Sequence, residues 1–228
     1  MTEITIDGAT EIFCLSPEER ELARAALWDE CKRRAMACNS CVLAQTRTNV
    51  VFGEGDRHSS LMFIGEGPGE TEDETGRPFV GKAGQLLTQI LASVGIERDD
   101  VYIANVVKCR PPGNRTPFPE EEAACDKLLQ TQILLIKPAI IVLLGSTPAK
   151  WILKTTEGIS KLRGRWFDWR GISVMPMFHP SYLLRFAGDK KPGGPKHLSW
   201  LDIQEVKKKW NLVRGQECCE EEDFDEHR

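Results

Sequence analysis

The sequence has no apolar run long enough to cross a membrane. Nowhere in its 228 residues is there an uninterrupted apolar stretch of the roughly 18 residues that a membrane-spanning helix needs. The first residues, MTEITIDGATEIF, also lack a basic segment followed by an apolar core, the mark of a secretory signal. We therefore expect a soluble cytoplasmic protein without a membrane partner, and 41% hydrophobic with 28% charged residues fits that class.

A large excess of charge is missing as well, since the net charge is only −4. Residues 217–228 hold seven acidic residues and one arginine, so they contribute −6 and leave +2 for residues 1–216. A nearly neutral body can still carry a local basic face for DNA, because the position of the charges matters more than their sum. We expect a loose arm over residues 1–15, one domain over 16–214 and an acidic tail over 215–228.

Cysteine, in contrast, is plentiful. Eight cysteines in a cytoplasmic chain favour metal binding or catalysis over disulfides, because that compartment keeps thiols reduced. Two pairs stand out: the CxxC of Cys38 and Cys41, and Cys109 with Cys125. Four thiolates suit either zinc or a [4Fe–4S] cluster, and their spacing does not choose between them. The alternative is a buried CxxC with two unrelated core cysteines.

Apolar runs alternate with segments of helical period along the chain. Strands are predicted at 61–64, 101–107, 139–144 and 172–178, with helices at about 16–35, 83–94, 119–137 and 198–214. This alternation is typical of an α/β domain with a mostly parallel sheet. In such sheets ligands bind beyond the carboxyl ends of the strands, where the distinctive loops of this chain begin.

Several side chains at those strand ends are candidates for function. His179 follows the fourth strand and is one of only four histidines. Asn105 lies in a strand, where asparagine is disfavoured, so its amide either reads a ligand or makes a structural hydrogen bond. Phe79 is either a core residue or a stacking platform. The loop from Gly65 carries five acidic residues and leads into a helix whose free N–H groups attract anions.

Taken together, these motifs resemble the family 4, iron–sulfur uracil-DNA glycosylases over residues 30–210. The resemblance rests on GEGPGETED, GRPFVGKAGQLL, NVVKCRPPGNRTP, HPSYLLR and the four spaced cysteines. It implies a three-layer α/β/α fold with a central four-stranded, mostly parallel sheet. It also implies a monomeric DNA repair enzyme that flips uracil out of single- or double-stranded DNA and hydrolyses its glycosidic bond.

The resemblance further assigns roles to particular residues. It implies a structural [4Fe–4S] cluster on Cys38, Cys41, Cys109 and Cys125. The implied catalytic residues are Glu66, Glu72 and His179, and the uracil-binding residues are Gly67, Phe79, Asn105 and Asn114. The DNA contacts implied are Gly145, Ser146, Ser181, Leu184 and Arg185. Related enzymes with aspartate at the position of Gly67 use it to activate water, so that role has to be shared or relocated here.

Two other classes of protein are compatible with parts of this pattern. An iron–sulfur electron carrier would use the cysteines but leave Asn105, His179 and the acidic loop without a role. A nucleotide phosphohydrolase could bind Mg²⁺ through the acidic loop, although the chain has no GxxxxGK[ST] motif. We therefore expect the glycosylase activity, with the other two as alternatives to be tested.

Overall fold

A computed structural model describes residues 16–186 and 191–225, with side chains up to residue 215. The predicted arm at residues 1–15 lies outside this range. The α-helices are α1 (Pro17–Met36), α2 (Glu70–Thr75), α3 (Lys82–Ala92), α4 (Pro119–Ile136), α5 (Ser146–Leu153), α6 (Ile159–Leu162), α7 (Pro180–Leu184) and α8 (Pro195–Asp225). Short 3-10 helices are η2 (Val42–Gln45), η3 (Arg98–Asp100) and η4 (Pro112–Asn114). The strands are β1 (Glu54–Gly55), β2 (Leu61–Gly65), β3 (Tyr102–Asn105), β4 (Ile140–Leu144), β5 (Phe167–Trp169) and β6 (Ile172–Met177).

The strands form a single sheet in the order β1-β3-β2-β4-β6-β5. Its four central strands are parallel, as predicted. The two short outer strands are antiparallel to their neighbours and raise the strand count to six. Strands β2, β3 and β4 are buried at every residue, which explains their continuous apolar sequences.

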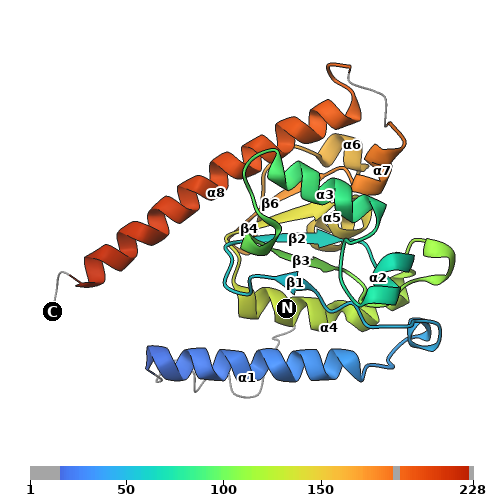
Figure 1. The fold of residues 1–228 in the computed structure, drawn as a ribbon, viewed down its shortest axis with the longest axis horizontal. Helices are drawn as coiled ribbons and strands as arrows, with labels where there is room; N and C mark the ends of the chain where they lie inside the picture. The colour runs from blue at the N-terminus through green and yellow to red at the C-terminus, as the bar shows by residue number, and fades with distance from the viewer. Residues whose placement is uncertain (1–15, 187–190, 226–228) are drawn as a thin grey trace.

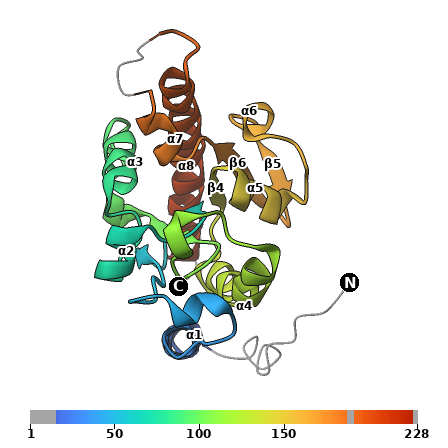
Figure 2. The ribbon, with the colours of Figure 1, turned by 90° about the vertical axis from the view of Figure 1, so that its right-hand side faces the viewer.

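Helices cover both faces of the sheet and complete three layers (Figure 1). Alternate residues of β2 point to opposite faces, so Met62 and Ile64 pack with α4 and α5. Leu61 and Phe63 pack with α3 and α8 on the other face. Helix α1 lies outside α4 (Figures 1 and 2). The predicted α/β/α architecture is thus confirmed.

Two elements differ from the sequence-based boundaries. The acidic loop contains the one-and-a-half-turn helix α2, which ends at Gly76 in the left-handed conformation, with φ of 71°. Helix α8 continues beyond Arg214 to Asp225 and extends away from the body of the protein (Figure 1). No helix of the described segments combines the length and the apolar character needed to span a bilayer.

Candidate active site

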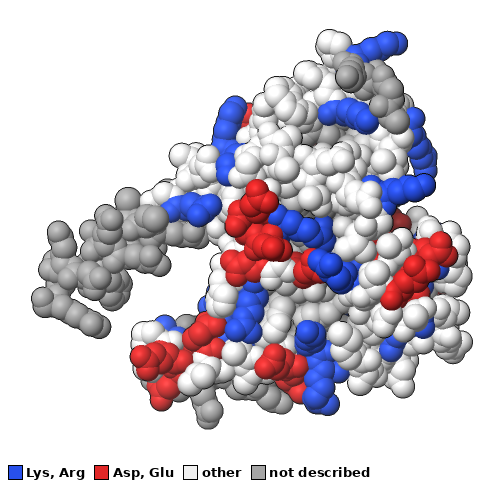
Figure 3. Space-filling model, in the orientation of Figure 1, with Lys and Arg blue, Asp and Glu red and all other residues white. Residues whose placement is uncertain are grey.

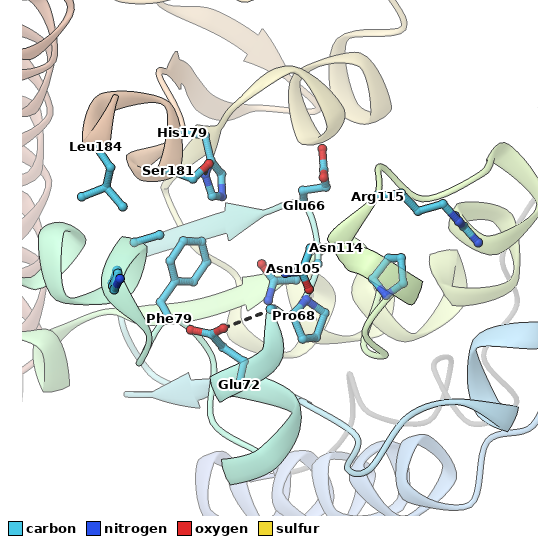
Figure 4. Close-up of a pocket in the computed structure, with 15 residues that line it drawn as sticks. Glu66, Pro68, Glu72, Phe79, Asn105, Asn114, Arg115, His179, Ser181 and Leu184 are labelled. Atoms are coloured by element: carbon cyan, nitrogen blue, oxygen red, sulfur yellow. Dashed lines mark hydrogen bonds between the residues drawn. The ribbon is translucent and has the colours of Figure 1, made fainter. Parts of the chain in front are cut away.

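A pocket of about 320 Å³ lies beyond the carboxyl ends of the central strands. Figure 2 views the protein from this side, and Figure 4 shows the residues that line the pocket. Nine predicted residues line it: Glu66, Gly67, Glu72, Phe79, Asn105, Asn114, His179, Ser181 and Leu184. The remaining lining residues are Pro68, Gly69, Lys82, Ala83, Pro111 and Arg115. The strand-end rule therefore brings together segments that are far apart in the chain.

Asn105 and Phe79 form one wall of the pocket, and Gly65 makes room for both side chains. A Cβ atom at Gly65 would lie 2.4 Å from Asn105 Oδ1 and 2.5 Å from Phe79 Cζ. Asn105 is almost completely buried, and its Oδ1 has no hydrogen-bond partner. Such an acceptor is costly unless a ligand satisfies it. In Figure 4 the Asn105 side chain faces the space bounded by Phe79 and His179.

His179 is oriented by the residues that follow it. Its Nδ1 accepts a hydrogen bond from Ser181 N at 3.1 Å and lies 2.7 Å from Ser181 Oγ. A neutral ring that accepts at Nδ1 carries its proton on Nε2. Burial lowers the pKa of His179 from 6.5 to about 4, and the Glu72 carboxylate acts weakly in the opposite direction. The site therefore holds a neutral imidazole with an Nε2–H donor.

The neutral state of His179 predicts a specific pH dependence of stability. As pH falls from about 6.5 towards about 4, the unfolded chain gains a proton at this histidine while the folded chain does not. The stabilising contribution of neutral His179 to the free energy of unfolding is therefore complete above that pH range and is lost as pH falls through it. We expect the unfolding temperature of His179→Gln to fall less steeply than that of the wild type. Parallel thermal melts at several pH values check this, and identical slopes would contradict it.

Gly145 and Ser181 have partners other than the predicted phosphates. The Gly145 amide donates to Met177 O at 2.9 Å, so it is not free to bind a phosphate. Gly145 has a φ of +100°, and a Cβ atom there would lie 3.1 Å from His179 Cβ. Both polar groups of Ser181 lie against His179 Nδ1. Ser181 thus orients the histidine, and Gly145 lies close to it. Ser146 on α5 and Ser181 are both exposed.

The two candidate carboxylates have different surroundings. Glu72 accepts hydrogen bonds from Gly69 N at 3.1 Å, Val80 N at 2.8 Å and Gly81 N at 2.7 Å. Glu66 accepts one from Thr147 Oγ1 on α5. In Figure 4 the Glu66 carboxylate points away from Phe79, whereas Glu72 lies below it. Glu72 therefore holds its surrounding loop together, and Glu66 has fewer competing donors.

Gly67 has little room for a side chain. A Cβ atom there would lie 2.7 Å from Cγ2 of Val107, which is fully buried. An aspartate at this position would therefore force Val107 to move. The packing thus gives a steric reason for glycine at this position.

Charged and exposed groups surround the mouth of the pocket. Asn114 accepts from Arg110 Nε at 2.8 Å, and Arg110 also contacts Glu70 of α2 at 3.2 Å. On α7, Leu184 is 38% exposed whereas Leu183 is buried, so of these two leucines only Leu184 is accessible to a ligand. Arg185, which follows α7, is exposed but does not line the pocket. Figure 3 shows lysine and arginine side chains towards α7 and an acidic group over α2.

The four predicted cysteine ligands lie in one neighbourhood. Cys109 and Cys125 are buried in the same core cluster, and Cys41 packs against it. Burial raises the pKa of Cys109, and the nearby Cys41 and Cys38 thiols add to this. Burial also raises the pKa of Cys125 to about 11. Over residues 16–186 and 191–215, no three His, Cys, Asp or Glu side chains converge closely enough to bind a single metal ion.

A buried polar network connects these cysteines with Asn105. The Lys108 amide donates to Cys125 Sγ at 3.4 Å, while Lys108 Nζ donates to the Asn105 carbonyl at 2.9 Å and to Gln132 Oε1 at 2.6 Å. Arg47 Nη1 donates to Cys109 Sγ at 3.2 Å. Arg47 thus lies beside a thiol, and the charge of the Lys108 side chain also acts to lower the pKa of Cys125, against the larger effect of burial.

Comparisons with known proteins agree with this site. The sequence profile described as "Uracil DNA glycosylase superfamily" matches residues 52–201, which include every residue that lines the pocket. The chain belongs to this superfamily. It is 54% identical over 164 residues to the type-4 uracil-DNA glycosylase of Thermotoga maritima, covering 71% of this chain and 85% of that protein. It is 46% identical to the type-4 enzyme of Sulfurisphaera tokodaii, covering 68% of this chain and 75% of that protein.

Other members of the superfamily are more distant. The type-5 uracil-DNA glycosylase of Pyrobaculum aerophilum is 32% identical over 57% of this chain and 64% of that protein. The matched superfamily region contains Cys109 and Cys125, whereas Cys38 and Cys41 precede it. Predictions for the CxxC pair therefore rest on the cysteine pattern and on the type-4 relatives.

Some residues that shape this superfamily site were not predicted from the sequence. Thr147, Val107 and Gly65 shape it through contacts with Glu66, Gly67 and Asn105 respectively. Their positions next to strand ends were a usable signal. Arg98 holds the Phe79 turn from a distant segment. A single arginine in a polar turn carries no recognisable sequence signal.

Proposed function

We propose that this protein removes uracil from DNA by hydrolysing its N-glycosidic bond, in keeping with the uracil-DNA glycosylase names of its type-4 relatives. The observation that carries the proposal is the buried Asn105 Oδ1, which lacks a partner in the wall of the pocket. Uracil offers a complementary N3–H donor. A base inside a duplex is inaccessible, so the nucleotide flips into the pocket before reaction.

Shape and hydrogen bonding together select the base. The Phe79 ring stacks on the flipped pyrimidine, with the His179 ring centroid 5.7 Å from that of Phe79. Asn105 accepts from uracil N3–H and donates to O4. Cytosine has an unprotonated N3 and an N4 amine, so it would leave the same amide mispaired. Each unsatisfied buried group costs about 1–3 kcal/mol, which supports discrimination against cytosine.

His179 stabilises the charge that develops on the leaving base. Cleavage leaves a uracil anion, and the Nε2–H of a neutral imidazole donates to its O2 without needing protonation. Fixed orientation by Ser181 reduces reorganisation during the reaction. A backbone N–H of the Glu66–Gly67 turn is the second proposed donor.

A carboxylate orients the attacking water and offsets the positive charge on the sugar. Glu66 and Glu72 are the candidates, and the three amide donors on Glu72 favour Glu66 for contact with water. Glu72 contributes a fixed negative charge to the same pocket. Because a Cβ atom at Gly67 has little space, no carboxylate can take that position without repacking.

The mouth of the pocket binds the DNA strand around the flipped nucleotide. Leu184 fills the space that the base vacates, and Arg185 and Ser146 contact the backbone phosphates. Gly145 and Ser181 support this surface indirectly through His179. Asn114 contributes to the wall on the uracil side.

Cys38, Cys41, Cys109 and Cys125 hold a [4Fe–4S] cluster. Four thiol donors with two neighbouring cations fit such a group, and a four-iron cluster keeps its ligands farther apart than one ion does. The cluster supplies a structural cross-link between the CxxC segment, the loop after β3 and α4. This role requires no participation in bond cleavage.

An excision assay tests the proposed activity. Oligonucleotides that contain one uracil, cytosine or thymine at the same position are incubated with the protein in EDTA and then treated with alkali, which cleaves abasic sites. We expect strand cleavage only at uracil, with single- and double-stranded substrates compared directly. Absence of cleavage at uracil would overturn the proposal.

The surroundings of the acidic residues do not favour a phosphohydrolase. Asp73 is buried and accepts from the amides of Thr48 and Asn49, while Glu72 and Glu66 have the separate partners described above. These carboxylates do not converge on one point where Mg²⁺ could bind. Metal-dependent release of phosphate from nucleotides would be the result that favours this alternative.

A further inference from the structure

The Phe79 turn adopts a backbone conformation that needs external support. Phe79 has a φ of 50°, in the left-handed region that residues other than glycine rarely adopt. Unlike a surface turn, this one is buried, and Phe79 is only 6% exposed. Strained residues persist where the surrounding structure holds them, and they concentrate at binding sites.

Arg98 binds the carbonyl side of this turn. Its Nη1 donates to Phe79 O at 3.0 Å, and its Nη2 donates to Pro78 O. The guanidinium is only 15% exposed and is itself held by Glu54, whose Oε1 lies 3.4 Å from Arg98 Nε. A planar guanidinium can bind two adjacent carbonyls at once, which a lysine ammonium cannot do in the same geometry.

Glu72 binds the amide side of the same turn. Its Oε1 accepts from Val80 N and Gly81 N, the two amides that directly follow Phe79. Helix α3 closes the third side, because a Cβ atom at Gly84 would lie 1.8 Å from Phe79 O. The Arg98 cation thus binds the two carbonyls of the turn, and the Glu72 anion binds the two amides that follow.

We infer that Arg98 is a positioning residue for the stacking ring, acting together with Glu72 to hold the Phe79 turn in its binding conformation before DNA arrives. The role in excision rests on the proposed function, whereas the effect on the turn does not. Arg98 is separated from the substrate by the turn and does not line the pocket. Its loss is expected to displace Phe79 rather than remove a contact with the base.

The chain offers a matched control in Arg77. Arg77 binds the same Glu54 carboxylate at 2.6 and 2.8 Å, but its side chain is 61% exposed and its guanidinium bonds Glu54 and not the carbonyls of the turn. Arg98→Met removes both the ion pair and the carbonyl bonds. Arg77→Met removes only an ion pair with Glu54. The difference between the variants isolates the contact with the turn.

Hydrogen exchange and kinetics of the full-length protein test the inference. In Arg98→Met we expect faster amide exchange over residues 79–84 without DNA, and a kcat/KM for a uracil oligonucleotide lowered on the order of a hundredfold. Arg77→Met should match the wild type in both. Arg98→Lys should keep the fold and give exchange rates and a kcat/KM between those of the wild type and Arg98→Met. If thermal melting shows that Arg98→Met is unfolded, Arg98→Lys takes its place.

The outcomes separate the two proposals. The inference is overturned if Arg98→Met shows the amide exchange and the kcat/KM of the wild type. If Arg98→Met does not fold, the same result in Arg98→Lys overturns it. If both arginine variants lose protection equally, Arg98 has no special role and the inference also fails. If the wild type does not release uracil, the proposed function fails, while the exchange data still decide whether Arg98 holds the turn.

Discussion

Asn105→Asp is expected to lower the kcat/KM for uracil excision about a thousandfold. The carboxylate can still accept from uracil N3–H, but it cannot donate to O4 and repels it. The lost hydrogen bond and the repulsion cost about 2 kcal/mol each, and each 1.4 kcal/mol corresponds to a factor of ten. Asn105 is almost completely buried in the wall of the pocket, and its Oδ1 has no hydrogen-bond partner within the protein. Single-turnover excision from a uracil oligonucleotide measures the effect.

Two comparisons make the Asn105 experiment decisive. Aspartate has nearly the same shape as asparagine, so the Gly65 and Phe79 contacts allow the pocket to stay folded, which thermal melting verifies. Asn211→Asp makes the same chemical change at an exposed site on α8 and should leave excision unchanged. A cytosine oligonucleotide shows whether the variant admits that base. Unchanged uracil excision by Asn105→Asp would remove Asn105 from base recognition.

Cys109→Ser is expected to cause the largest loss of stability. Serine is a poor ligand for iron, so the variant should lose the brown visible absorbance and the iron content expected of the proposed cluster. Structural metal centres contribute about 10 kcal/mol to folding, comparable with the total stability of a domain, about 5–15 kcal/mol. The variant should therefore unfold at a much lower temperature. Iron analysis, visible absorbance and thermal melting measure these effects without requiring activity.

Cys31→Ser is the matched control for this experiment. Cys31 is also a buried thiol, with 5% exposure, but it lies outside the proposed ligand set. The Cys31→Ser protein should keep its colour and iron content. Its free energy of unfolding should fall by only about 1–3 kcal/mol, as is typical when a hydroxyl is buried. A coloured, stable Cys109→Ser protein would show that Cys109 is not a cluster ligand.

Local sequence patterns were enough to predict the layers of the fold and most of the pocket. The apolar run Ile140–Leu144 had to be a strand buried on both faces, and three further runs of this kind required a parallel sheet covered by helices. Because parallel strands end at one edge, the residues at their carboxyl ends met in one pocket. Asn105 and His179 could therefore be grouped from the sequence, whereas Phe79 joined them only through the family resemblance.

Roles within the pocket depended on contacts that no local pattern encodes. Gly145 and Ser181 looked suitable for phosphates, yet their partners are Met177 and His179. Glu72 looked like a residue for binding water, yet it accepts three amides. The edge strands β1 and β5 have only two and three residues, too few to show a period.

The sequence alone determined which chemical groups are available and at which edge of the sheet they gather, because strand and helix periods are properties of neighbouring residues. Only the tertiary structure decided which of these groups remain free for a ligand. Thr147 is 81 positions from Glu66 and Arg98 is 19 from Phe79, so their hydrogen bonds exist only after the chain has folded. The unpaired Asn105 oxygen likewise becomes recognisable only when every possible partner has been placed.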